Sequence, residues 1–424
     1  MSGNNICLLV AATMLAGCAT TAPPRSAETF TPDCAAIASF IDGAVAEGRI
    51  AGANALVYHR GEETCFKSAG LASVKDGTPY TRETLVQIFS MTKPVTGVAL
   101  MQLWEQGRFG LDDPLEDHLP EYAGLGVFVR MGEDGTPVTR PPSRKVTIRD
   151  VLRHTAGFTY GNADHPSDPI WEELQPLAAT NTLAQFSQKM AQVPLLHDPG
   201  THWQYSAGVD VQARLVEVLS GMAFADYVDA NIFTPLGMDD TGWRRSTAEI
   251  PRLARIYAGG EDNVLTPMPE EEWLEAAFAG NPMTMGGSGL VATVDDYMRF
   301  ARMLLGEGEL DGARILRPAT VRLMATDQLD PRIAADDRSW LVGKGNGGFG
   351  FDFFVRTGPP QTAAENRGTV GEFFWDGYAS TLFWVDPAQD MAVVFLPQKI
   401  PFDNPLHHDF RDAVYGADYT GTVR

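Results

Sequence analysis

The sequence predicts an α+β fold in which both chain ends contribute strands to one antiparallel sheet flanked by helices, with a mostly helical segment between them. Strand-like runs occur near the two ends, and helix-like runs occupy the middle. After about residue 32, no linker rich in Ser, Gly or Pro and no block of charge divides the chain. We therefore expect one domain over residues 33–424, with its sheet part at about 33–90 and 285–424 and its helical insert at about 91–284.

The elements follow from periodicity and turn residues. Residues 34–47 predict a helix, and residues 53–59 and 64–70 predict a hairpin about a turn at Arg60. Four strand-like runs near the other end begin at Phe349, Glu372, Ser380 and Met391. Helices are expected near residues 92–106, 147–153, 206–220 and 294–305. No repeat with a period of about 20 to 50 residues is visible, which argues against a solenoid or a propeller.

Composition narrows the classes of function. The chain has 424 residues, of which 44% are apolar and 21% are charged, so it is long enough to bury a large core. Its formal net charge of -21 opposes binding to nucleic acid and to anionic membrane surfaces. We expect no polyanionic partner, and the sequence leaves the oligomeric state open.

The N-terminus predicts export. The apolar run from Ile6 to Cys18 is too short to span a bilayer and ends in small residues, which is typical of a signal peptide over residues 1–17. The ending L-A-G-C, Leu15 to Cys18, resembles the bacterial lipobox, which implies a lipidated Cys18 that tethers a periplasmic lipoprotein to the membrane through a flexible segment, residues 18–32. The segment S-G-N-N from Ser2 has no Lys or Arg, so a plain secretory signal is the alternative.

Two cysteines would remain in the mature domain. Cys34 and Cys65 form an even pair in a chain expected to be exported, so they can form a disulfide. Two buried free thiols are the alternative, because the sequence does not fix the distance between the two residues.

The stretch F-S-M-T-K-P, Phe89 to Pro94, carries the first chemical signal. Proline is tolerated in the first turn of a helix, so Pro94 places a helix start near residues 90–92. Ser90 and Lys93 are three residues apart and share one face, so the Lys93 ammonium can reach the Ser90 hydroxyl. The apolar run from Val95 to Leu103 predicts a buried helix, and burial lowers the pKa of a lysine toward neutrality. A serine at such a place is also an ordinary helix cap, so these four residues alone are only suggestive.

This stretch and several others along the chain match one known pattern. S-M-T-K, Ser90 to Lys93, resembles the first motif of the serine β-lactamase and penicillin-binding protein superfamily. Similar surroundings are G-R-F-G-L-D-D-P-L from Gly107, I-R-D-V-L-R-H-T-A-G from Ile148, P-G-T-H-W-Q-Y-S-A from Pro199 and G-G-S-G-L-V-A-T-V-D-D-Y-M from Gly286. The resemblance covers nearly all of residues 35–400 and is strongest to the class C branch and the family VIII carboxylesterases. It implies a β-lactamase/transpeptidase-like fold.

The resemblance also assigns catalytic groups. The second motif of the family falls on Tyr205, Ser206 and Ala207, and implies that Tyr205 accepts the Ser90 proton. We expect the Lys93 charge to lower the pKa of Tyr205. A core aromatic residue before a helix is the alternative reading of this tyrosine.

The third motif falls on W-D-G, Trp375 to Gly377. It implies an oxyanion hole formed by the backbone N–H groups of Ser90 and Tyr378. A simple turn that enters a strand is the alternative for this triplet.

Departures from the β-lactamase pattern favour an ester substrate. Ala207 and Trp375 stand where β-lactamases carry an amide and a lysine, and Asp376 would repel a substrate carboxylate by about 1 to 4 kcal/mol. The residues expected to contact substrate are Trp375, Asp376, Gly377, Ala207, Phe158 and Trp203. Some of these aromatic residues would otherwise belong to the core.

We therefore expect a serine hydrolase that forms an acyl-enzyme on Ser90 and acts on short neutral esters. The rivals are a β-lactamase or D-amino-acid peptidase with the same nucleophile, and a catalytically silent binding module of the cell envelope. No G-x-S-x-G elbow and no zinc-ligand spacing is present, so we expect no metal and no cofactor. The run G-K-G-N-G-G from Gly343 reads as a mobile loop, and His154 as the end of a helix.

Overall fold

A computed structural model describes residues 30–161, 164–243, 246–270, 272–273, 282–333, 344–419 and 421. The predicted signal peptide and Cys18 lie outside these residues. Phe30, which the sequence analysis assigns to the tether, packs its ring 5.4 Å from that of Tyr415 and 5.5 Å from that of Tyr419. Phe30 therefore packs against the folded domain, although it falls within the segment 18–32 that is expected to form a tether.

The main sheet has eight strands in the order β12-β13-β14-β15-β16-β1-β2-β3, and adjacent strands are antiparallel. Its strands are β1 (Gly52–His59), β2 (Glu62–Ser73), β3 (Thr78–Pro79), β12 (Gly347–Phe349), β13 (Phe354–Arg356), β14 (Phe373–Asp376), β15 (Leu382–Asp386) and β16 (Met391–Pro397). Val57 of β1 pairs with Val393 of β16, so the two chain ends meet at the middle of the sheet. This confirms the predicted assembly.

One predicted strand is wrong. The run from Phe349 to Arg356 is divided between two strands, since Phe349 ends β12 and Phe354 begins β13, and these strands pair with each other across a tight turn. Asp352 lies in that turn with φ 61°, in the left-handed region that ends an extended run. The residues are nearly all apolar, so periodicity alone did not reveal the turn.

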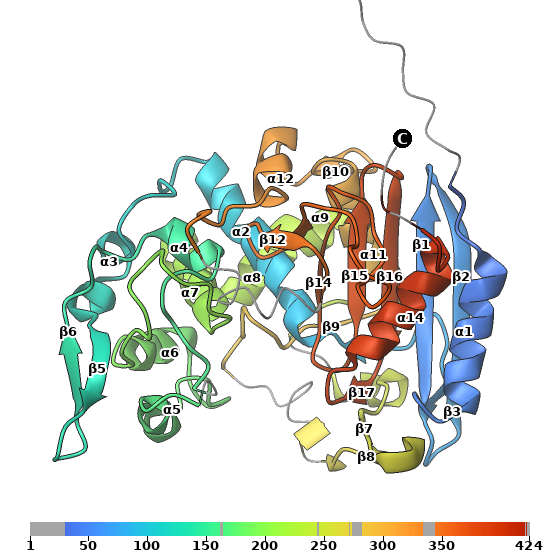
Figure 1. The fold of residues 1–424 in the computed structure, drawn as a ribbon, viewed down its shortest axis with the longest axis horizontal. Helices are drawn as coiled ribbons and strands as arrows, with labels where there is room; N and C mark the ends of the chain where they lie inside the picture. Colours follow the sequence, from blue (N-terminus) through green and yellow to red (C-terminus); the bar gives the residue numbers. More distant parts are fainter. Residues whose placement is uncertain are drawn as a thin grey trace, which may run out of the picture.

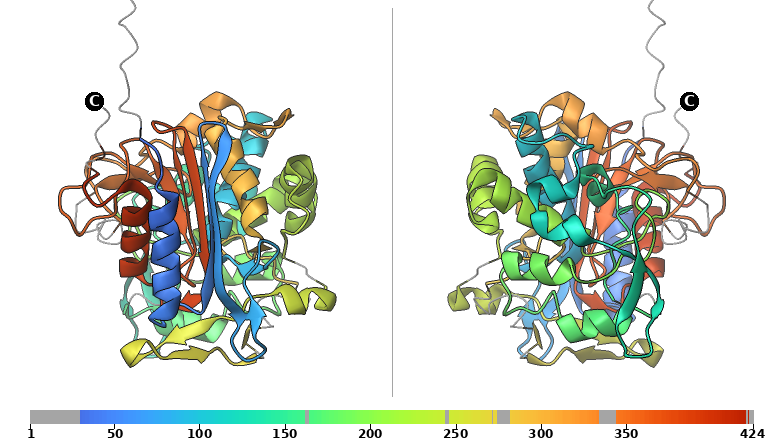
Figure 2. Two further views of the ribbon diagram at one scale, coloured as in Figure 1. Left: turned by 90° about the vertical axis from the view of Figure 1, so that its right-hand side faces the viewer. Right: turned by 90° about the vertical axis from the view of Figure 1, so that its left-hand side faces the viewer.

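Helices cover both faces of the sheet (Figure 2). One face carries α1 (Cys34–Ala46) and α14 (Asn404–Tyr415), and the other carries α11 (Val294–Leu305) with α2 (Thr92–Glu105) beyond it. In α1 the buried residues are Ile37, Ile41 and Ala44, which recur at the spacing of one helical face.

The second subdomain is mostly helical and lies beside the sheet, with α2 between the two parts (Figure 1). It contains α3 (Leu115–His118), α4 (Ile148–Leu152), α5 (Asp168–Leu174), α6 (Leu183–Met190), α7 (Gly208–Ser220), α8 (Phe224–Val228), α9 (Thr234–Leu236) and a hairpin of β5 (Val127–Met131) and β6 (Pro137–Arg140). Eleven of the residues in α2 are buried, because the helix packs against both subdomains.

The remaining described strands form small sheets of two or three strands. They are β4 (Val86–Gln87) with β9 (Val291–Ala292), β7 (Tyr257–Gly259) with β8 (Leu265–Pro267) and β17 (Lys399–Ile400), and β10 (Glu309–Leu310) with β11 (Ala313–Arg314). A further helix is α12 (Pro318–Met324). The pairing of β4 with β9 brings the residues before Ser90 beside the segment that follows Gly289.

Cys34 and Cys65 form a disulfide, with their Cα atoms 5.4 Å apart. The bond joins the first turn of α1 to β2 and decides between the two states that the sequence left open. Across the described residues, no helix combines the length and apolar character that a membrane span requires.

Candidate active site

Ser90 lies in a short 3₁₀ turn, η1 (Phe89–Met91), that runs directly into α2. Pro94 is in the first turn of this helix, as its missing N–H group predicts. Phe89 has φ 45°, a conformation that is strained for a residue with a side chain and that gathers at functional sites. The Tyr297 hydroxyl donates to the Met91 carbonyl oxygen at 2.7 Å and holds the turn from the side of α11.

The side chains of Lys93 and Tyr205 meet at the Ser90 hydroxyl. Lys93 Nζ lies 3.1 Å from Ser90 Oγ, and the Tyr205 hydroxyl donates to the same oxygen at 2.7 Å. Lys93 Nζ also donates to the Gly287 carbonyl oxygen at 2.7 Å. Ser90 and Tyr205 are partly exposed, whereas Lys93 is 1% exposed. The structure thus brings the three predicted catalytic residues together around one hydroxyl that solvent can reach.

Burial lowers the pKa of Lys93 to about 8, although the carboxyl groups of Asp210, Asp352 and Asp376 act in the opposite direction. This confirms the predicted effect of the buried helix. The expected effect on Tyr205 is wrong: burial raises its pKa above the ordinary value of 10.0, and this outweighs the hydrogen bonds with Ser90 and Trp375. Near neutral pH, Tyr205 is therefore a neutral phenol that donates its proton in a hydrogen bond.

Aromatic rings surround Tyr205 and fix its position. The rings of His154 and Trp375 lie 5.1 Å and 5.6 Å from it, and that of Trp203 lies 6.3 Å away. His154 follows α4, as predicted for a helix end, but it is buried behind the tyrosine. Trp203 and Trp375 are 4% and 1% exposed, so their main role is to pack against Tyr205 and not to line an open substrate cleft.

Two of the residues expected to contact substrate belong to the core. Phe158 is 1% exposed, and its ring packs against Tyr122. Ala207 is fully buried where the chain enters α7. For Phe158 and Ala207 the structure therefore favours the core role over contact with substrate.

The third motif lies at the end of β14, against the turn that carries Ser90. The amide of Gly377 donates to the Thr381 carbonyl oxygen at 2.9 Å, and a side chain at Gly377 would overlap the Ile88 carbonyl oxygen. The ring of Tyr378 then contacts that of Phe89, with 6.0 Å between ring centres. The two segments that carry the predicted oxyanion-hole amides, those of Ser90 and Tyr378, are thus neighbours.

The sequence predicts that Asp376 places an uncompensated negative charge beside the substrate. The structure shows that this charge is compensated. The Asp376 carboxylate forms an ion pair with Lys344, and both side chains are nearly fully buried. Lys344 Nζ also lies 5.0 Å from the ring centres of Trp375 and Phe402. The loop prediction for G-K-G-N-G-G missed this lysine, whose contact is made across 32 residues of sequence.

Sequence reasoning also missed Asp210, Tyr160 and Asp352. Asp210 Oδ1 accepts the Gly287 amide at 3.1 Å, while Asp352 Oδ1 accepts the amide group of Gln212 at 3.1 Å. The ring of Tyr160 lies 5.4 Å from that of Tyr205. Asp210, five residues after Tyr205, sits in the first turn of a helix, where an aspartate is unremarkable, so nothing in the sequence marked it.

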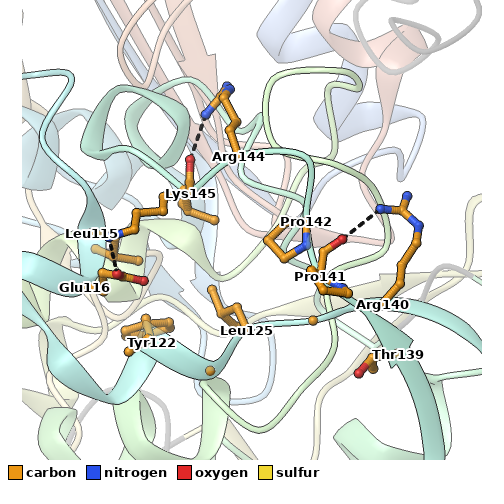
Figure 3. A pocket seen from close by; sticks show the side chains of 14 residues that line it. Leu115, Glu116, Tyr122, Leu125, Thr139, Arg140, Pro141, Pro142, Arg144 and Lys145 are labelled. Carbon is orange, nitrogen blue, oxygen red and sulfur yellow. Dashed lines mark hydrogen bonds and ion pairs between the residues drawn. The ribbon is translucent and has the colours of Figure 1, made fainter.

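A separate hollow of about 550 Å³ lies beside the β5–β6 hairpin (Figure 3). Its basic residues Arg140, Arg144 and Lys145 form ion pairs with Asp198, Asp150 and Glu116. None of Ser90, Lys93 and Tyr205 lines it. In the described part of the chain, no group of three or more His, Cys, Asp or Glu side chains is arranged to hold a metal ion.

Comparison with known proteins agrees with this geometry. A family model described as "Beta-lactamase" matches residues 37–415. The chain belongs to the beta-lactamase family. This is a family of serine hydrolases that includes esterases, and the fold is the β-lactamase/transpeptidase-like fold that the resemblance implied.

Three relatives of this beta-lactamase family member are informative. Protein Rv1367c of Mycobacterium tuberculosis is 33% identical over 84% of this chain and 87% of its own. Esterase EstB of Burkholderia gladioli is 28% identical over 93% of this chain and 99% of its own. The structure of EstCE1, described as a hydrolase with promiscuous acyltransferase activity, has a TM-score of 0.74 and 25% identity, and covers 90% of this chain and 98% of its own.

Proposed function

We propose that the protein is a carboxylesterase that forms an acyl-enzyme on Ser90 and hydrolyses short neutral esters. The observation that carries this proposal is the position of Ser90 Oγ, within hydrogen-bonding distance of both Lys93 Nζ and the Tyr205 hydroxyl. The similarity to EstB, an esterase, supports the same class of substrate.

Proton transfer follows from the two pKa shifts. Because the pKa of Lys93 is about 8, a fraction of this amine is neutral near pH 7 and can accept the Ser90 proton. Ser90 Oγ then bonds to the ester carbon, and the carbonyl oxygen takes the negative charge beside the amides of Ser90 and Tyr378. This assigns to Lys93 the base role that the resemblance gave to Tyr205.

Tyr205 completes the cycle as a proton donor. When the tetrahedral intermediate collapses, the C–O bond to the alcohol breaks and the leaving oxygen takes the Tyr205 proton. The Lys93 ammonium returns a proton to Tyr205. Water then attacks the acyl-enzyme by the same steps in reverse, and its proton passes through Tyr205 to Lys93.

The argument against amide substrates now rests on what is missing at Ala207 and Trp375: both side chains are buried, and neither offers the amide or the ammonium that β-lactamases carry at these motif positions. Asp376 no longer contributes, because the Lys344 ammonium compensates its charge. A catalytically silent binding module remains the rival of another class, but such a module has no need of a lysine and a tyrosine that both meet one reachable serine hydroxyl.

Labelling and turnover test the proposal together. The wild type and the Ser90→Ala variant are treated with a fluorophosphonate, weighed intact by mass spectrometry, and assayed with p-nitrophenyl butyrate and nitrocefin. We expect one adduct and ester turnover in the wild type, both lost in Ser90→Ala, with little nitrocefin hydrolysis. Ser220→Ala, a partly exposed serine at the end of α7, is the matched control that keeps both.

Each other outcome has a meaning. Strong nitrocefin turnover would move the assignment to a β-lactamase, and the absence of an adduct would leave the binding module. Transfer of the acyl group to an added short alcohol, measured as a new ester, would add the second activity for which EstCE1 is described.

We also propose export of the chain and lipidation of Cys18. The Cys34–Cys65 disulfide supports an oxidising compartment. Incorporation of labelled palmitate by the wild type and its loss in Cys18→Ala is the expected result. Export without label would favour the plain secretory signal.

A further inference from the structure

Gly287 connects Lys93 to a buried carboxyl group. The Gly287 carbonyl oxygen accepts from Lys93 Nζ at 2.7 Å, and its amide donates to Asp210 Oδ1 at 3.1 Å. Asp210 is in the first turn of α7 and is 1% exposed. One peptide segment is therefore held from two sides, by the base on α2 and by the carboxyl group on α7.

The absence of a side chain at Gly287 permits this arrangement. A Cβ atom there would lie 2.8 Å from Asp210 Oδ2, 2.9 Å from the Tyr160 hydroxyl oxygen and 3.3 Å from Lys93 Nζ. These three polar groups converge on one face of the glycine. The carboxyl group of Asp210 is therefore a close neighbour of the amine, although the two form no direct hydrogen bond.

The other groups that face Lys93 are neutral or compensated near pH 7. Burial raises the pKa of Asp352 well above its ordinary value, which favours the neutral form of that carboxyl group, and the Asp376 carboxylate is paired with Lys344. Burial also lowers the pKa of His154 and raises those of Tyr160 and Tyr205, so these rings are uncharged.

Asp210 differs from these groups. Burial raises its pKa only to about 6, because the Lys93 charge and the Gly287 amide act in the opposite direction. At pH 7 its carboxyl group is mostly ionised. Three carboxyl groups raise the pKa of Lys93 against the effect of burial, and Asp210 has the largest effect of the three.

We propose that Asp210 is a positioning residue for the reaction at Ser90, which anchors Gly287 against Lys93 and supplies the negative charge that faces the amine. This inference rests on the proposed function, in which neutral Lys93 accepts the Ser90 proton. The Asp210 carboxyl group accepts the Gly287 amide, so it acts on Lys93 through Gly287 and through its charge.

Substitutions separate the anchor from the charge. Asp210→Asn keeps an oxygen for the Gly287 amide and removes the charge, and Asp210→Ser is a second uncharged replacement if the first does not fold. Asp210→Glu keeps the charge on a longer side chain. Circular dichroism and thermal unfolding identify the variants that are folded before any rate is measured.

The readout is the pH dependence of kcat/KM with p-nitrophenyl butyrate. Without the negative charge, Lys93 loses its proton at lower pH, so the acid limb of Asp210→Asn should move down by about 1 pH unit. At pH 6.5 its rate, relative to its own plateau, should then exceed that of the wild type by about 8-fold. Asp210→Glu should restore the wild-type limb even where its kcat is lower.

Asp296→Asn is the matched control. Asp296 is a buried carboxyl group whose pKa is also raised to about 6, but its partners are Thr241 and Asp240 and not the active site. Its acid limb should coincide with that of the wild type. A limb of Asp210→Asn that coincides with the wild type, or that moves to higher pH, overturns the inference.

The two proposals fail in different ways. If Ser90→Ala keeps its turnover, the proposed function is wrong, whatever Asp210 does. If turnover and fluorophosphonate labelling depend on Ser90 but the acid limb does not respond to the charge at position 210, only the role of Asp210 is wrong.

Discussion

Gly377 makes a close contact between two parts of the active site. A Cβ atom there would overlap the Ile88 carbonyl oxygen and the Thr381 hydroxyl, so any side chain must push β14 away from the Ser90 turn. That movement would displace the Tyr378 amide from the position that an oxyanion needs. We expect Gly377→Ala to lower kcat/KM for p-nitrophenyl butyrate by about 10²-fold to 10³-fold.

The control for this variant is Gly43→Ala, in the last turn of α1. A Cβ atom at Gly43 has nothing within 4 Å, and alanine favours a helix over glycine by about 1 kcal/mol. Activity should be unchanged and Tm slightly higher. A folded Gly377→Ala enzyme with full kcat/KM would show that the Tyr378 amide does not stabilise the transition state.

Single residues of the site could be predicted only where the chain itself carries the pattern. Ser90 and Lys93 share one helical turn, and a motif at fixed spacing marks Tyr205, so the sequence identified all three. Lys344 and Asp210 reach the site through contacts across 32 and 77 residues of chain, which no local pattern encodes. The pKa of Tyr205 depends on how deeply the folded protein buries it, so its direction was predicted wrongly.

At the scale of elements, a network of buried charges joins the sheet to α14. Arg411 donates to Glu372 Oε1 at 2.8 Å, and the Tyr415 hydroxyl lies 3.0 Å from Glu372 Oε2 and 2.8 Å from Asp386 Oδ2. Arg411 and Glu372 are fully buried. Each charge depends on its partner, because water cannot solvate it.

We therefore expect Arg411→Met to lower the free energy of unfolding by about 3 to 5 kcal/mol, since it leaves Glu372 with less compensation. Urea unfolding measures the effect. Arg322→Met, which breaks an exposed pair with Glu307, should cost about 1 kcal/mol or less. Equal losses in the two variants would mean that the buried network contributes no more than a surface ion pair.

The disulfide stabilises the junction between α1 and β2. It closes a loop with a sequence separation of 31 residues, for which the chain-entropy model gives about 3 to 4 kcal/mol. The double variant Cys34→Ser and Cys65→Ser should lose about this much stability in urea unfolding. Reductant should destabilise the wild type to the same degree and leave the double variant unaffected; a wild type indifferent to reductant would argue against the bond.

Most elements could be predicted because their ends are marked. Asp33 caps α1, Pro94 fixes the start of α2, and the turn at Arg60 and Gly61 separates β1 from β2. The division between β12 and β13 could not be predicted, because its turn lies within an apolar run that the folded core buries on both sides.

At the scale of the whole molecule, the free energy of unfolding should depend on pH, because some buried groups lower it and others raise it as the pH falls. Burial lowers the pKa of His407 to about 4, and its Nε2 donates to the Ser380 carbonyl oxygen at 2.8 Å. The unfolded chain binds this proton more strongly, so His407 costs stability as pH falls from about 6.5 toward 4. Asp296 and Asp386, with pKa values raised to about 6, act oppositely over about pH 6 to 4.

His407→Gln isolates one of these contributions. The glutamine amide cannot take up a proton, so the variant lacks the loss of stability that His407 causes at low pH. The Tm at pH 5, relative to the Tm at pH 7, should therefore be higher in the variant than in the wild type by roughly 1 to 3 °C. Differential scanning calorimetry at the two pH values measures it. A change in Tm identical to that of the wild type would mean that His407 does not titrate on unfolding in this range.

The α+β fold with strands from both chain ends was predictable from the order of the elements, and the structure confirms it. The same arrangement constrains how the chain can be made. Strand β1 has β2 on one side, but its other edge stays open until β16, near the far end of the chain, is synthesised. An incomplete chain would expose that edge to other nascent chains. We therefore expect the enzyme to gain its activity only after synthesis is complete, and C-terminal truncation to produce aggregates in place of a smaller active domain.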